Sequence, residues 1–91
     1  MKRIKLKCLN DECDYQKTIV AFLTIPFDPA LGATYEEIMA TAPLLEKVRS
    51  AENVLDVSDE EHEIIVARLK NGRYKNISMD TYTMLKEITD A

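Results

Sequence analysis

Residues 58–72 read SDEEHEIIVARLKNG, and this stretch predicts an α-helix with its own start and stop signals. Ser58 is placed to accept a hydrogen bond from the Glu61 amide, while the Glu61 carboxylate can reach back to the Ser58 amide. Acidic residues fill the first turns and basic residues the last turn, each where the helix dipole favours that charge. Asn71 and Gly72 tolerate the left-handed conformation that ends a helix. The stretch therefore predicts a helix over residues 58–71.

Two more segments carry helical signals. Thr34 opens a second capping box, and apolar residues then recur at helical spacing as far as Ala51. Pro43 lies inside this segment and lacks a backbone donor, so residues 34–51 form either a kinked helix or two helices. Ser78 is expected to cap a final helix over residues 78–89.

The N-terminal segment predicts a β-hairpin over residues 1–27. Apolar and basic residues alternate from Arg3 to Leu9, as in a strand with one buried face. Residues 10–12 are polar and suit a turn. Residues 18–25 are apolar on both faces and rich in β-branched residues, which is typical of a covered strand. Leu55 and Val57 are candidates for a short third strand.

These elements predict a single α+β domain over residues 1–91. We expect a β-hairpin or small antiparallel sheet, packed against three or four short helices. The chain is 46% hydrophobic and 31% charged, with a net charge of -4, as in an ordinary globular protein. No apolar run approaches the roughly 18 residues of a membrane span. The basic start is followed by polar residues where a signal peptide needs an apolar core, so we expect a cytoplasmic protein.

The search for reactive groups gives no catalytic residue. Two glycines are too few for a phosphate-binding loop, and His62, the only histidine, is expected on the surface over Val57. Cys8 is expected to face the core, and Cys13 to be a free thiol near a turn. Their spacing leaves open a zinc-supported module, although a second pair of ligands is missing. We therefore predict no enzyme, no cofactor and no metal site.

Two groups of basic residues are candidates for binding. One lines the first strand and the other flanks the turn at residues 71–72, with an aromatic residue among them. The first comprises Lys2, Arg3, Lys5 and Lys7, and the second Arg68, Arg73, Tyr74 and Lys75. Such groups can track a nucleic-acid backbone, but lysines also protect edge strands and cations belong at helix ends. Nucleic-acid binding is therefore the alternative, and an acidic protein partner suits the same residues.

The apolar segment 18–25 carries the other binding hypothesis. If helices cover only one face of a strand there, its second face is left exposed. We expect that face to meet a partner protein or a second subunit in a homodimer. The predicted protein-binding residues are Val20, Phe22, Arg68, Arg73, Tyr74 and Lys75.

The C-terminal half resembles small proteins encoded by tailed bacteriophages and prophages. The resemblance covers about the last fifty residues and lies in packing positions around the helix that starts at Ser58. The matching residues are Leu45, Val48, Ala51, Val54, Leu55, Val57, Ser58, Glu60, Glu61, Ile64, Ile65, Tyr82, Leu85 and Ile88. It implies a non-enzymatic phage accessory or inhibitor protein that binds a host or virion protein in the host cytoplasm. It implies no site residues.

Overall fold

The computed structural model describes residues 1–91 and has an α+β fold with four helices and one two-stranded sheet. In chain order the elements are β1 (Lys2–Lys5), α1 (Tyr15–Thr24), α2 (Tyr35–Ser50), β2 (Val54–Val57), α3 (Asp59–Lys70) and α4 (Met79–Thr89). The predicted class, α+β with a small antiparallel sheet and three or four helices, is confirmed. None of the helices is both long and apolar enough to span a membrane.

The sheet joins distant parts of the chain. β1 pairs antiparallel with β2, and Ile4 lies opposite Leu55 while Lys2 lies opposite Val57. Ile4, Leu55 and Val57 are buried on one face, and Arg3 and Lys5 point to the opposite, exposed face. The predicted short strand at Leu55 and Val57 is confirmed, but its partner is β1 rather than a neighbouring hairpin.

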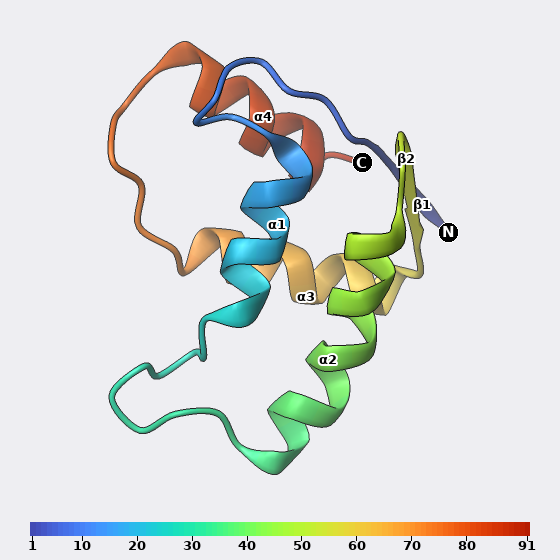
Figure 1. Ribbon diagram of the computed structural model, residues 1–91, viewed down its shortest axis with the longest axis vertical. Coiled ribbons are helices and arrows are strands. Elements are labelled where there is room, and N and C mark those ends of the chain that lie inside the picture. The colour runs from blue at the N-terminus through green and yellow to red at the C-terminus, as the bar shows by residue number, and fades with distance from the viewer.

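The expected hairpin over residues 1–27 is wrong. Residues 15–24 form helix α1, which stands in the middle of the molecule between α2 and the connector that leads to α4 (Figure 1). Asp14 caps it by accepting a hydrogen bond from the Lys17 amide, and Tyr15, Ile19 and Leu23 are buried at helical spacing. A short apolar run fits a covered strand and a buried helix equally, and here the helical period prevails.

The other helices match their predicted ranges. Ser58 and Glu61 form the reciprocal capping box, with distances of 3.1 Å and 2.8 Å between donor and acceptor. Ser78 caps α4 through the amide of Thr81. α2 is one helix and is not split at Pro43. Pro43 and Met39, the residue one turn earlier, are both exposed, so water can satisfy the carbonyl that the proline leaves free.

The core lies where all four helices meet the inner face of the sheet. Its members are almost fully buried and come from every element. They are Ile4, Cys13, Tyr15, Ile19, Leu23, Leu44, Val48, Leu55, Val57, Ile65, Leu69, Met84 and Ile88. The first half of α2 contributes nothing to this core and projects from it together with the preceding loop (Figure 1).

Two predicted placements are reversed. Cys8 is exposed and Cys13 is buried, because β1 ends at Lys5 before it can carry Cys8 into the core. His62 is buried rather than superficial, and its Nε2 atom lies 2.8 Å from the carbonyl oxygen of Ile88. The imidazole therefore joins α3 to the end of α4 and has a structural role.

Candidate protein-binding surface

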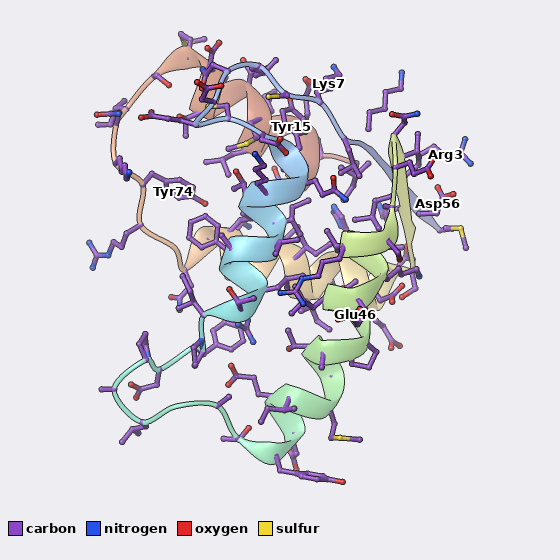
Figure 2. All side chains as sticks on the ribbon, viewed as in Figure 1. Arg3, Lys7, Tyr15, Glu46, Asp56 and Tyr74 are labelled. Atoms are coloured by element: carbon purple, nitrogen blue, oxygen red, sulfur yellow. The ribbon has the colours of Figure 1, made fainter.

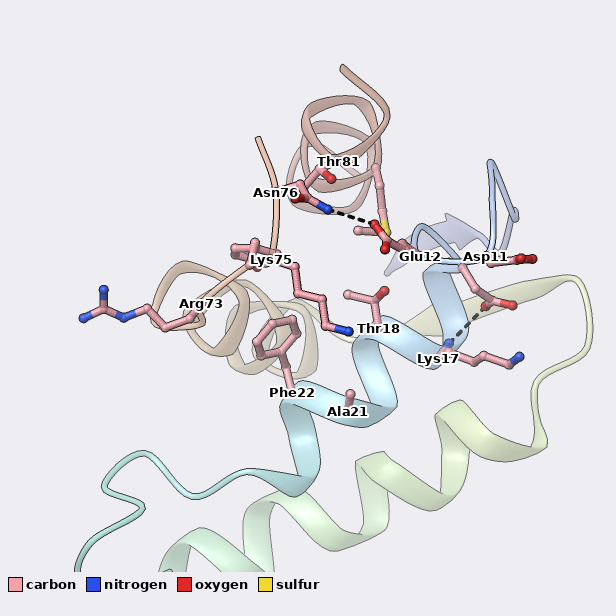
Figure 3. A pocket seen from close by; sticks show the side chains of 13 residues that line it. Asp11, Glu12, Lys17, Thr18, Ala21, Phe22, Arg73, Lys75, Asn76 and Thr81 are labelled. Atoms are coloured by element: carbon pink, nitrogen blue, oxygen red, sulfur yellow. Dashed lines mark hydrogen bonds between the residues drawn. The ribbon is translucent and has the colours of Figure 1, made fainter. Parts of the chain in front are cut away.

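Four of the six predicted protein-binding residues line one pocket. Phe22 of α1 lines it together with Arg73, Tyr74 and Lys75 of the connector between α3 and α4. Figure 3 shows the Arg73 guanidinium pointing away from Phe22. The pocket has a volume of about 330 Å³ and is completed by the turn before α1 and the start of α4. Val20 faces a separate shallow groove beside Arg49, and Arg68 is buried elsewhere. The six residues therefore do not form one surface.

An aromatic pair holds this pocket together. The rings of Phe22 and Tyr74 lie 5.1 Å apart at an angle of 48°. The Tyr74 hydroxyl donates to the carbonyl of Leu69 at 2.7 Å, which ties the connector to α3. Burial raises the pKa of Tyr74. Gly72 leaves room for Phe22, because a methyl group at this position would overlap the ring.

The walls of the pocket carry charges of both signs. Its lining includes the bases Lys17, Arg73 and Lys75 and the acids Asp11, Glu12 and Asp14. The Asn76 side chain donates to Glu12 at 3.3 Å. Neither Arg73 nor Lys75 takes part in an ion pair. Since acids and bases are mixed, the pocket has no excess of one charge to select an anion or a cation.

Arg68 lies in the interior and organises the loop that precedes α2. Its guanidinium donates to the carbonyl of Ile25, to the Glu37 carboxylate at 2.9 Å and to the Thr41 hydroxyl at 3.3 Å. It also lies 4.1 Å from the ring centroid of Phe27. Only 4% of its side chain is exposed, and its Nε atom has no hydrogen-bond partner. The residue expected at a helix end and a binding surface is therefore a buried crosslink between α1, α2 and α3.

Glu37 completes this crosslink. Its backbone amide donates to the capping hydroxyl of Thr34, as predicted, but its carboxylate does not return to the Thr34 amide. Instead the carboxylate accepts from the backbone amide of Phe27 at 3.1 Å and from Arg68. The second half of the expected capping box is thus replaced by contacts that fix the loop.

The loop and the start of α2 display an unusual amount of apolar surface. Six of the twelve large apolar side chains that are exposed lie within residues 25–39. We call these residues the apolar loop face, and they are Ile25, Phe27, Leu31, Tyr35, Ile38 and Met39. Leu31 is 86% and Tyr35 is 77% exposed, so neither depends on the core for its position. Apolar residues at helical spacing usually mark a buried helix face, but Tyr35, Ile38 and Met39 are exposed, so the pattern does not hold for the first half of α2.

Two grooves border the apolar loop face. One, of about 210 Å³, lies between α1 and α2 and is lined in part by Leu23, Ile38 and Leu45. The other, of about 330 Å³, is lined by Phe27, Pro29 and the turn at Gly72. Arg68 lines both. The face is therefore hollowed on two sides, which lets it receive protruding apolar side chains of another molecule.

The basic strand is partly neutralised by carboxylates. Arg3 forms an ion pair with Asp56 at 2.8 Å, and this hydrogen bond lowers the pKa of Asp56 (Figure 2). Lys7 pairs with Glu87 at 2.8 Å and lowers its pKa, with help from the Tyr15 hydroxyl. Burial and the hydrogen bond to Glu87 raise the pKa of Tyr15 to about 12. Lys2 and Lys5 remain as the unpaired cations of this strand.

No group of three or more histidine, cysteine, aspartate or glutamate side chains is arranged to hold a metal ion. Cys13 lies in the core with its sulfur 3.6 Å from the Thr81 hydroxyl, while Cys8 faces solvent and contacts the carbonyl of Asn10. The two thiols thus have different surroundings.

A signal for the apolar loop face was present in the sequence. No lysine or arginine occurs between Lys17 and Lys47, and prolines at 26 and 29 place apolar residues in a loop.

Comparison with known proteins supplies no relative from which a site could be transferred: no protein-family model, no curated protein and no solved structure matches this chain.

Proposed function

We propose that this protein is a non-enzymatic interaction module that binds a partner protein through the apolar loop face. The observation that carries the proposal is the concentration of exposed, large apolar side chains in residues 25–39. Large exposed apolar patches are rare on soluble monomers unless they meet another molecule, and six exposed apolar side chains within residues 25–39 favour such a contact. The resemblance to small bacteriophage proteins is the reason to look for that partner among host or virion proteins.

The fixed shape of the face supports the proposal. Glu37 and Arg68 hold Phe27 and the end of α1 in place, so the loop has little freedom left to lose when a partner binds. Tyr35 and Phe27 offer aromatic anchors, which are enriched among the residues that dominate binding energy.

The alternatives have weaker support. Arg3 and Lys7 already have carboxylate partners, and Arg68 is buried, so the free cations of the two basic groups are Lys2 and Lys5 on the sheet and Arg73 and Lys75 on the separate connector before α4. A zinc-supported module through Cys8 and Cys13 would need further ligands, and elemental analysis of the purified protein tests it.

Affinity capture with tagged variants tests the proposed function. Leu31→Ser with Ile38→Ser removes two apolar groups from the face, and we expect it to lose the captured partner. Ile77→Ser with Met79→Ser is the matched control, since those side chains are at least as exposed but lie at the start of α4. All four side chains are outside the core, so circular dichroism should show unchanged folding for both double variants. Capture that survives the loop substitutions contradicts the proposal.

A further inference from the structure

The apolar loop face is bordered by acids alone on its α2 side. Residues 18–46 contain four acidic residues and no basic one, and these acids are Asp28, Glu36, Glu37 and Glu46. Glu37 is neutralised by Arg68, and Glu46 pairs with Arg49 at 3.4 Å. Asp28 and Glu36 are exposed and form no ion pair. The face therefore presents apolar side chains beside two uncompensated negative charges.

The position of these two charges is set by local structure. The Asp28 carboxylate accepts from the backbone amides of Ala30 and Leu31 at 3.1 Å and 3.3 Å, which holds it inside the loop. Glu36 sits in the first turn of α2, three residues before Met39, and so shares a helix side with it. The groove between α1 and α2 is lined by no free cation, whereas the groove toward Gly72 includes Arg73.

We propose that the partner of this face is a polypeptide segment whose apolar side chains are flanked by lysine or arginine. This inference rests on the proposed function and names the chemistry of the partner. Complementary charges at the border of an apolar contact guide encounter and exclude wrong partners. Basic side chains of the segment would meet the carboxylates of Asp28 and Glu36, while its apolar side chains contact Leu31 and Met39, the exposed apolar side chains next to these acids.

The same charges argue against a second copy as the occupant. A two-fold dimer through this face brings the patch of one subunit against the same patch of the other. Asp28 and Glu36 would then face a negative patch, with no basic residue in 18–46 to compensate. An anionic membrane surface is disfavoured for the same reason.

Selection from a library of random displayed peptides on the immobilised full chain tests the inference. We expect the enriched peptides to combine apolar residues with a net positive charge. Peptides resynthesised with each Lys or Arg replaced by Glu should bind the wild-type protein at least about tenfold more weakly. Enriched peptides that are neutral or acidic overturn the inference.

Matched variants separate this local effect from the overall negative charge of the protein. Asp28→Asn with Glu36→Gln should abolish the preference for basic peptides. Glu60→Gln with Glu63→Gln removes the same charge from exposed positions of α3 and should preserve it. A preference that the α3 variant loses equally overturns the inference and leaves the proposed function standing. Peptide binding that Leu31→Ser with Ile38→Ser does not reduce contradicts both the inference and the proposed function. A dimer that sedimentation detects and that those substitutions dissociate contradicts the inference alone.

Discussion

Replacement of Arg68 by Met should destabilise the protein by about 3 kcal/mol, the lower end of the range for breaking a buried ion pair. The substitution keeps the apolar stem of the side chain but removes every guanidinium contact. Glu37 would then retain its charge at 15% exposure without a cation, and the carbonyl of Ile25 would lose its donor. The lower end of the range applies because Glu37 still accepts from the Phe27 amide.

The size of the coupling between the two residues is the sharper measurement. Glu37→Gln alone leaves a buried guanidinium without its counter-ion and should also destabilise by about 3 kcal/mol. Arg68→Met combined with Glu37→Gln leaves neither charge unpaired, so its loss should fall short of the sum by about 2–3 kcal/mol. Urea unfolding monitored by circular dichroism gives all four free energies of unfolding.

An exposed ion pair on α2, the helix that carries Glu37, provides the control. Glu46 and Arg49 of α2 lie 3.4 Å apart with most of their side chains in solvent, so Arg49→Met with Glu46→Gln should change the free energy of unfolding by less than about 0.5 kcal/mol. Strictly additive losses for Arg68→Met and Glu37→Gln, or losses as small as that control, would refute the assignment of Arg68 as a buried crosslink.

Three further results are expected from single perturbations. The hydrogen bond from the Ser58 amide and the contact with Lys47 lower the pKa of Glu61 in the folded protein. The stabilisation by Glu61 is therefore present above the pKa of the unfolded state, about 4, and is lost as the pH falls through the lower pKa of the folded state. Glu61→Gln should flatten the acid limb of a curve of stability against pH, and an unchanged limb contradicts this. Tyr15, whose pKa is raised to about 12, should stabilise the fold below pH 10 and lose that effect as the pH rises through 12, and ultraviolet titration of Tyr15→Phe should lack the highest phenolate transition. Gly72→Ala should push Phe22 from Tyr74 and destabilise by about 1–3 kcal/mol, with reduced near-ultraviolet dichroism, whereas no loss means that the ring is free to shift.

The elements with complete local signals were predictable from the sequence. α3 begins and ends within one residue of its predicted limits because its N-terminal cap and its charges act over a single turn. The left-handed residue expected at Asn71 or Gly72 is wrong, since Asn71 is right-handed and Gly72 has no positive φ. α4 follows for the same reason. The range of α2 was also predictable, and Pro43 was overrated because its missing hydrogen bond faces water.

The errors arose where long-range contacts decide. Residues 18–25 are rich in β-branched side chains, but the burial of Tyr15, Ile19 and Leu23 against α2 and α3 outweighs this propensity. The pairing of Lys2 with Val57 spans more than half of the chain, and no local pattern specifies it. The apolar residues at the start of α2 have the spacing of a buried face, and only the missing second layer over them reveals that they are exposed.

The ion pair between Arg68 and Glu37 links the stability of the fold to the display of the apolar loop face. A buried ion pair is often no more stabilising than well-packed apolar residues of similar volume, so stability alone gives little reason for one here. What apolar residues cannot do is satisfy the Ile25 carbonyl, the Thr41 hydroxyl and, through Glu37, the Phe27 amide at once. Each of these contacts lies at the root of the loop or of the projecting half of α2. The pair therefore selects one arrangement of residues 25–39, and a fixed arrangement is what binding through exposed apolar side chains requires.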